Sequence, residues 1–472
     1  MDDLAALSAS ALAAAIARRD VAPSEVMAAC LDRIARINPA LNAVVGLRDG
    51  DALMAEARAA DDAPRRGWLH GIPLAVKDLQ AVAGIRSTAG SPLFADHLPI
   101  ADEMLARRLR AAGAILIGKT NVPEFGLGSH SFNPVYGVTA NPYAPDRTAG
   151  GSSGGAAAAL AARLVPVADG SDMMGSLRNP AAFCNVYGFR PSFGRVPADP
   201  VGDTFLHMLA TDGPMGRTIE DIARLLETLA APAATSPHAM PPEPFAAALD
   251  ADPAGLRIGW LGDWGGAWPM EPGILDLCEA ALASFAAMGC HVEPVAPPIP
   301  AAPIWDAWCT LRSWVIAARL GPLHAAPETR ARLKPEALWE IERGLALDAM
   351  AVHRASVVRS AWFTAAAALF ARFDALAMPA AQVWPFPKAW HWPEKIGAAP
   401  MDTYHRWMEC VVPVSLIGLP ALAVPVGFGG TDGTLPMGMQ LAGPRGADRA
   451  ILRLGQAWHR ATDWPGRRPP PV

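Results

Sequence analysis

The sequence lacks the features that mark nucleic-acid-binding and membrane proteins. It has no run of basic residues and a formal net charge of −5, whereas a nucleic-acid binder shows a basic patch or stripe. No stretch reaches the roughly 18 uninterrupted apolar residues of a spanning helix. The start, MDDLAALSAS, is acidic, unlike the basic start of a secretory signal. We therefore expect a cytoplasmic protein without nucleic-acid or membrane partners.

Cysteine is also scarce, and its spacing excludes two classes of site. The six cysteines show no paired spacing of the kind that indicates a zinc ribbon or a disulfide scaffold. We interpret them as ordinary buried thiols. They are Cys30, Cys184, Cys278, Cys290, Cys309 and Cys410.

Apolar residues make up 51% of the 472 residues, which is ample for a large buried core. The apolar spacing predicts amphipathic helices over 8–19 and 23–37. Beyond them, short apolar runs bounded by Gly or Pro alternate with helical stretches. This alternation predicts an α/β fold with a central mixed, mostly parallel twisted sheet covered by helices on both faces. The runs are LNAVVGL, GIPLAVKD, GAILIGK, RLVPVADG, LRIGWLGD, CHVEPV, PALAVPVGF and MGMQLAG.

Two short motifs suggest functions that their surroundings disfavour. GAILIGKT, 113–120, satisfies the phosphate-loop pattern, but its middle residues are themselves an apolar strand rather than a flexible turn after one. GGSSG, 150–154, satisfies the nucleophile-elbow pattern with Ser152 as nucleophile, but the preceding NPYAPDRTA is a loop where an elbow needs a strand. An esterase of the elbow type stays open as an alternative.

The glycine-serine stretch feeds directly into the helix former AAAALAARL. Unpaired N–H groups at a helix start favour a binding site over a flexible linker. Two further residues draw attention: Lys77, at the end of the apolar strand IPLAV, and Ser176, in DGSDMMGSLRNP. Lys77 is either a surface cation paired with Asp78 or a desolvated amine able to act as a base.

At these residues the sequence resembles the amidase signature family. GIPLAVKD, GGSSGG and DGSDMMGSLRNPAAFCNVYGFRPS occur in the order of the family's lysine, glycine-serine loop and G-[ST]-D-x-G-G-S-[IVL]-R segment. Lys77 precedes Ser152 by 75 residues, and Ser152 precedes Ser176 by 24. The resemblance covers nearly the whole chain and implies one amidase signature domain over 1–466.

Within that domain we expect an N-terminal helical layer over 1–65, a catalytic core over 66–220 and a variable, Trp-rich substrate region over 300–410. A disordered tail is expected over 467–472. The variable region holds nine of the 15 tryptophans. Because Trp offers a large contact area, we expect an apolar or aromatic amide, anilide or carbamate as substrate, although core packing or a homodimer surface also explains such residues.

The resemblance implies a Ser–cisSer–Lys triad without metal or organic cofactor. Ser176 is then the nucleophile, Ser152 the bridging serine after a cis peptide bond from Gly151, and Lys77 the base. Backbone N–H groups of Met173, Met174, Gly175 and Ser176 are expected to line the substrate site and hold the oxyanion.

Asp172 and Arg178 flank this loop, and we expect them to brace it rather than form a surface ion pair. Met174 departs from the family pattern, which has Gly at this position. A positive φ would be costly for Met, so a negative φ is predicted. The thioether either fills a gap or narrows the acyl side of the site.

The sequence therefore predicts an amidohydrolase of linear amides. The alternatives are the amidase subunit of a tRNA amidotransferase, the Ser152 esterase, a nucleotide-binding protein and a catalytically silent scaffold.

Overall fold

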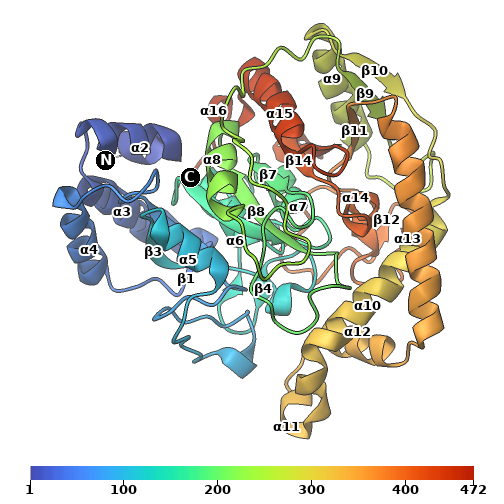
Figure 1. Cartoon of the computed structure of the whole chain (residues 1–472), viewed down its shortest axis with the longest axis horizontal. Helices are drawn as coiled ribbons and strands as arrows, with labels where there is room; N and C mark the ends of the chain where they lie inside the picture. The colour runs from blue at the N-terminus through green and yellow to red at the C-terminus, as the bar shows by residue number, and fades with distance from the viewer. Residues whose placement is uncertain (1) are drawn as a thin grey trace.

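The computed structural model describes residues 2–472, and its largest sheet has eight strands. The sheet runs through the middle of the molecule (Figure 1). Its strands, in spatial order, are β10 (His291–Pro294), β9 (Arg257–Trp260), β11 (Ala375–Pro379), β15 (Leu435–Ala442), β14 (Ala421–Gly429), β7 (Tyr187–Arg190), β8 (Thr211–Gly216) and β6 (Val167–Asp172).

This sheet is mixed, as predicted, but the expectation that it is mostly parallel is wrong. Only β9 forms parallel pairs, with β10 and β11, and the other pairs in the described sheet are antiparallel. Three of the five antiparallel pairs involve the C-terminal hairpin, in which β14 and β15 are joined by residues 430–434. A hairpin is antiparallel by construction, and this one lies in the centre of the sheet. Alternation of strands and helices along the sequence does not reveal such an insertion.

A second sheet of three strands lies on the N-terminal side and carries one functional residue. Its order is β1 (Val44–Val45), β3 (Ile115–Thr120) and β2 (Pro73–Lys77), with β2 and β3 parallel. The phosphate-loop motif falls on β3, so the prediction that it is a strand is confirmed. The side chain of Lys119 is buried there, and its amine donates to the backbone oxygen of Gln80.

Five helices precede or flank this small sheet, at the left of Figure 1. The helix predicted over 23–37 continues through Pro39 to Leu41 and is followed by the cap residue Asn42, whose φ of 51° is left-handed. The helix predicted over 8–19 is capped by Ser8, whose hydroxyl accepts from the backbone N–H of Ala11. The five are α1 (Asp2–Ala6), α2 (Ala9–Arg18), α3 (Pro23–Leu41), α4 (Gly50–Asp62) and α5 (Met104–Ala111).

The remaining helices cover the large sheet and build the Trp-rich region. The long helices α10, α12 and α13 pack together at the right of Figure 1. The helices are α6 (Gly154–Ala161), α7 (Arg178–Phe183), α8 (Ile219–Leu229), α9 (Ile274–Ala287), α10 (Ala301–Ala325), α11 (Pro327–Arg330), α12 (Pro335–Leu345), α13 (Ala349–Phe370), α14 (Val412–Leu416), α15 (Asp448–Thr462) and α16 (Trp464–Arg467).

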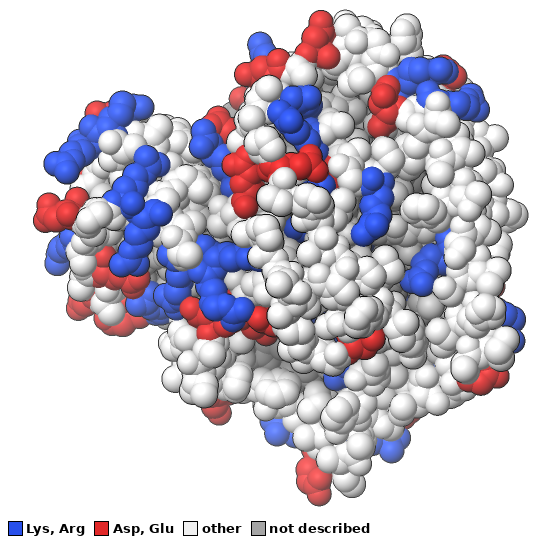
Figure 2. Space-filling view, viewed as in Figure 1, with Lys and Arg blue, Asp and Glu red and all other residues white. Residues whose placement is uncertain are grey.

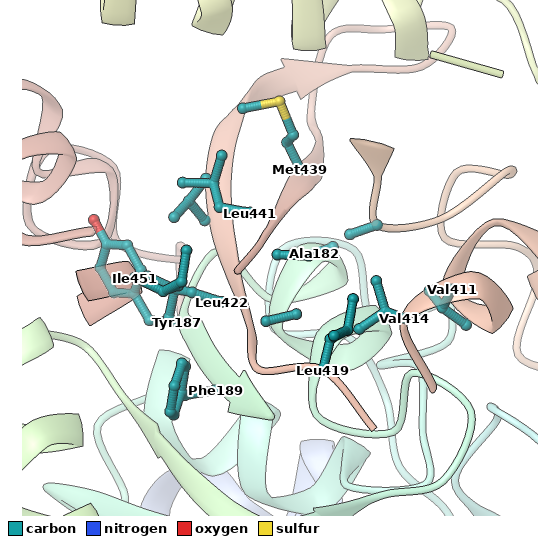
Figure 3. Close-up of a cluster of buried hydrophobic side chains, with 14 of the residues drawn as sticks. Ala182, Tyr187, Phe189, Val411, Val414, Leu419, Leu422, Met439, Leu441 and Ile451 are labelled. Carbon is teal, nitrogen blue, oxygen red and sulfur yellow. The ribbon is translucent and has the colours of Figure 1, made fainter. Parts of the chain in front are cut away.

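Helices cover both faces of the large sheet, as predicted. Successive side chains of a strand point to opposite faces, and Leu422 and Ala423 of β14 belong to different core clusters. Leu422 packs with Ile451 of α15, whereas Ala423 packs in the cluster formed by α6 and α7. Figure 3 shows Leu422 and Ile451 beside Tyr187 of β7 and Leu441 of β15. Burying each such side chain contributes about 1.5–3 kcal/mol, so this packing fixes the central hairpin.

Several further expectations concern the chain as a whole. All six cysteines are free and buried, as predicted. The backbone oxygen of Arg468 accepts hydrogen bonds from Tyr143 and Asn185, and disorder over 467–472 stays a prediction. No helix within residues 2–472 is long and apolar enough to cross a membrane. On the face in Figure 2, acidic and basic side chains are interspersed over the N-terminal helices, and much of the other surface in view is uncharged.

Candidate active site

Lys77 ends strand β2 as a fully buried side chain. The surface-cation interpretation is therefore wrong. Asp78 instead accepts hydrogen bonds from the Thr88 backbone and hydroxyl and lies 3.9 Å from the amine of Lys119.

The Lys77 amine is surrounded by serine hydroxyls. Its Nζ lies 2.9 Å from Ser152 Oγ, 2.8 Å from Ser153 Oγ and 2.9 Å from Ser171 Oγ. The Ser171 backbone oxygen lies 3.3 Å away. No carboxylate within the described chain forms an ion pair with Nζ. The amine is therefore buried without a negatively charged partner in direct contact.

Burial lowers the pKa of Lys77 to about 7, although Asp212, Asp169 and Asp172 act in the opposite direction. Burial in turn raises the pKa of Asp169 to about 6 and that of Asp212 to about 7, and Asp169 adds to the effect on Asp212. Asp169 accepts from the Lys77 backbone N–H at 3.1 Å. A neutral amine is therefore accessible near neutral pH, which is the requirement for a lysine base.

The glycine-serine loop is positioned by the strands and loops around it. The Gly151–Ser152 peptide bond is cis, as the family resemblance implies. Ser131 Oγ accepts from Gly154 N–H at 3.1 Å, and the Ser153 N–H donates to the backbone oxygen of Ser176 at 3.2 Å. This last bond joins the glycine-serine loop directly to the Ser176 loop. The described residues 141–151 contain no strand leading into Ser152, so the elbow requirement is not met.

Asp172 and Arg178 form a buried brace rather than a surface pair, as predicted. Arg178 Nε and Nη2 each lie 3.0 Å from a different oxygen of the Asp172 carboxylate, and both side chains are fully buried. Arg190 adds a second guanidinium at 3.1 Å. Burial alone would raise the pKa of Asp172, but Arg178 and Arg190 hold it well below its usual range. The carboxylate is therefore ionised throughout the ordinary pH range.

The same carboxylate holds the backbone of the loop. It accepts from Gly175 N–H at 2.9 Å and from Leu177 N–H at 3.2 Å. Gly175 has a φ of 79°, and a Cβ at this position would collide with Asn179 Oδ1. Only glycine fits this turn, and Ser176 is the residue that follows it.

The expected set of oxyanion donors needs one correction. Gly175 N–H is already bound by Asp172, so it is not a free donor in this arrangement. The N–H groups of Met173, Met174 and Ser176 have no hydrogen-bond partner within residues 2–472. Sequence reasoning missed this because a backbone donor's partner depends on how the Asp172 side chain folds back onto its own loop.

Ser152, Ser171 and Ser176 open into one cavity of about 510 Å³, a volume that includes open solvent. Ser176 is 7% exposed. Lys77 is hydrogen-bonded to Ser152. Within the described chain no hydrogen bond joins the Ser176 hydroxyl to Ser152, although both serines line the same cavity. Such contacts are often long in the unliganded protein and tighten on substrate binding.

Met173 and Met174 both line this cavity, whereas no tryptophan does. Met174 is 3% exposed and belongs to the main core cluster, so it contacts the core and the cavity together. It is absent from the residues with positive φ, so the predicted negative φ is confirmed. Of the tryptophans in the 300–410 region, most are buried and Trp390 is half exposed. Apolar lining comes instead from Leu79, Phe125, Leu127, Met173, Met174, Ala210, Ile316 and Met408.

Several residues of the site carry no signal of their own in the sequence. Ser153 and Ser171 stand inside quoted motifs, yet only the fold shows that both reach Lys77. Arg190 is the last residue of β7, and its contact with Asp172 at the end of β6 depends on the antiparallel pairing of both strands with β8. No group of three or more metal-ligating side chains occurs among the residues the structure describes.

The fold and the site together define an α/β protein with a buried lysine and serine hydroxyls at a solvent-open cavity. The chain belongs to the amidase signature family: the family model Amidase matches residues 25–452. A glutamyl-tRNA(Gln) amidotransferase subunit from Chloroflexus aurantiacus is 33% identical, over 99% of this chain and 99% of its own length. An acylamidase of Rhodococcus erythropolis is 32% identical, over 98% of this chain and 97% of its own length.

Among solved structures, a bacterial aryl acylamidase of the amidase signature family has a TM-score of 0.90 and 30% identity. The match covers 98% of this chain and 99% of the aryl acylamidase. The resemblance found in the sequence is confirmed.

Proposed function

We propose that this protein is an amidase that hydrolyses linear carboxamides through an acyl-enzyme on Ser176. The observation that carries the proposal is the 2.9 Å contact between the amine of Lys77 and the hydroxyl of Ser152, in the cavity that Ser176 also lines. A serine hydroxyl is a weak nucleophile until a base removes its proton. The lowered pKa of Lys77 supplies such a base near pH 7.

The hydrogen-bond geometry suggests how the base is oriented. A neutral amine has two N–H groups and one lone pair, but three hydroxyls lie within 2.9 Å of Nζ. At least one hydroxyl must therefore donate to it. In our proposal Ser153 and Ser171 accept the two N–H groups, and the lone pair faces Ser152.

The relay then runs from Ser176 through Ser152 to Lys77. As Ser176 Oγ attacks the amide carbon, its proton passes to Ser152, whose own proton passes to Lys77. The reverse transfer protonates the departing amine, and water releases the acid in a second cycle. The N–H groups of Met173, Met174 and Ser176 would donate to the oxyanion.

The relatives support amides as the substrate class. Two of the similar proteins are named acylamidase and aryl acylamidase. The apolar cavity lining suits an amide with an apolar or aromatic body, and aryl amides and carbamates belong to this proposal.

A second candidate function is the amidase subunit of a tRNA amidotransferase. The Chloroflexus relative is named as a subunit of such an enzyme and matches the whole chain at 33% identity. That function needs partner subunits, whereas a free-standing amidase does not.

One experiment separates these two candidates. The chain is purified alone and incubated with small aliphatic and aryl amides, and the release of ammonia or aniline is followed. A free-standing amidase turns over these substrates, and Lys77→Met abolishes the turnover while the protein remains folded. Turnover that appears only after addition of other subunits would favour the amidotransferase.

A further inference from the structure

Helix α10 presents one face to the cavity. Arg312, Ile316 and Arg319 are spaced by four and three residues, so they lie above one another on the same side of a helix. All three line the cavity, opposite side chains that come from other segments. The wall formed by α10 therefore carries two guanidinium groups with an apolar side chain between them.

The charge of Arg312 is balanced within the protein. Its Nε lies 2.6 Å from Glu340 Oε1 and its Nη2 lies 2.7 Å from the Tyr404 hydroxyl, and all three side chains are buried. Its Nη1, however, has only the thioether sulfur of Met173 at 3.3 Å. A thioether is a weak acceptor, so the Nη1 donor at the cavity wall lacks a strong hydrogen-bond acceptor.

The charge of Arg319 is not balanced by a direct contact. Its side chain is exposed, and it has no ion pair or hydrogen bond within residues 2–472. Glu103 and His207 lie close enough for Arg319 to influence their pKa values, yet neither binds it. No Asp or Glu lines the cavity in the described chain. The cavity is therefore electropositive on its α10 side.

We propose that the substrate carries a carboxylate that Arg319 binds, with the apolar body of the amide lying along Ile316 toward Ser176. Arg–carboxylate pairs are planar and two-pronged, which gives orientation as well as affinity. The inference rests on the proposed amidase function and names its substrate class: amides that combine an apolar portion with one carboxylate. Arg312 Nη1 supplies a further donor on the same wall.

Binding is measured with matched ligands, so that the test does not depend on turnover. Ser176→Ala protein is titrated calorimetrically with N-succinyl para-nitroanilide and N-butyryl para-nitroanilide, which differ by a terminal carboxylate on the acyl side. A second pair, para-acetamidobenzoate and acetanilide, places the carboxylate on the amine side. We expect the carboxylate member of one pair to bind about tenfold more tightly, the scale of a hydrogen-bonded charge.

The same titrations are repeated with Arg319→Gln, Arg319→Lys and Arg354→Gln, each combined with Ser176→Ala. The carboxylate preference should fall to about one in Arg319→Gln, return in part in Arg319→Lys and persist in Arg354→Gln. Arg354 is an exposed residue of α13 outside the cavity lining. Equal binding within both pairs, a preference that survives Arg319→Gln, or no binding of any ligand would overturn the inference.

Turnover of the same four compounds by the Ser176-containing protein is followed separately. A carboxylate preference in binding without any hydrolysis would contradict the amidase proposal and leave the role of Arg319 supported.

Discussion

Arg178 and Asp172 form a two-pronged ion pair from which solvent is excluded, with both N–O distances at 3.0 Å. The pair joins the Ser176 loop to the C-terminal half of the chain. Arg178 Nη1 also donates to Gln440 Oε1 at 2.6 Å, and its Nη2 donates to Ser415 Oγ at 2.6 Å. The loop geometry therefore depends on residues more than 200 positions away.

Removing this guanidinium should destabilise the protein and stop turnover. Arg178→Met leaves Asp172 buried with only Arg190 as its cation, and losing one partner of a buried pair costs about 3–5 kcal/mol. Arg178→Lys keeps the positive charge but cannot make the two-pronged contact, so its stability and turnover should lie between those of the unmodified protein and Arg178→Met. Denaturant unfolding and amide turnover measure the two effects, and Arg354→Gln is the control. Full stability and full turnover in Arg178→Met would refute the brace.

The pH dependence of kcat/KM should follow the protonation of Lys77. Burial lowers its pKa to about 7, so the neutral base becomes more abundant as pH rises, and kcat/KM should rise with a midpoint of about 7. Asp212 raises the pKa of Lys77. Asp212→Asn should therefore move the midpoint to lower pH.

The control for this charge change is Asp432→Asn, on an exposed turn. It should leave the midpoint in place. A profile that falls as pH rises through 7, or a midpoint that moves upward in Asp212→Asn, is incompatible with Lys77 as the base.

The hydroxyls of Ser153 and Ser171 should act through the orientation of Lys77. A hydrogen bond of this kind is worth about 0.5–1.5 kcal/mol. Ser153→Ala and Ser171→Ala should each lower kcat by roughly two- to tenfold with little change in KM, and Ser171→Thr should restore most of the loss. A change confined to KM would mean that these serines contact substrate instead.

Met174 should limit the size of the acyl group. The side chain lines the cavity and is 3% exposed. Met174→Ala should raise the ratio of kcat/KM for bulky over small acyl groups by about tenfold and cost roughly 2–5 kcal/mol of stability. Met437→Ala, in the buried part of β15, should lose stability without changing the ratio. An unchanged ratio in Met174→Ala would show that the thioether only fills a gap.

How far the sequence predicts this protein can be judged from particular residues. The strands β2 and β3 follow from local patterns, because apolar runs and turn residues act within a few positions. The expectation that Lys77, Ser152 and Ser176 share one site comes from the family resemblance instead. The contact of Ser171 with Lys77 spans 94 residues, and that of Arg178 with Gln440 spans 262. Such contacts depend on which strands pair, and the inserted β14–β15 hairpin shows that one sequence does not reveal the pairing.

The identity of the nucleophile is tested most directly by covalent labelling. Intact mass is measured after treatment with a fluorophosphonate for the unmodified sequence and for Ser176→Ala, Ser152→Ala and Lys77→Met, with circular dichroism to confirm folding. The account predicts one adduct on the unmodified protein, slower labelling of Ser152→Ala and Lys77→Met, and none on Ser176→Ala. Persistent labelling of Ser176→Ala together with its loss in Ser152→Ala would contradict the account and make Ser152 the nucleophile.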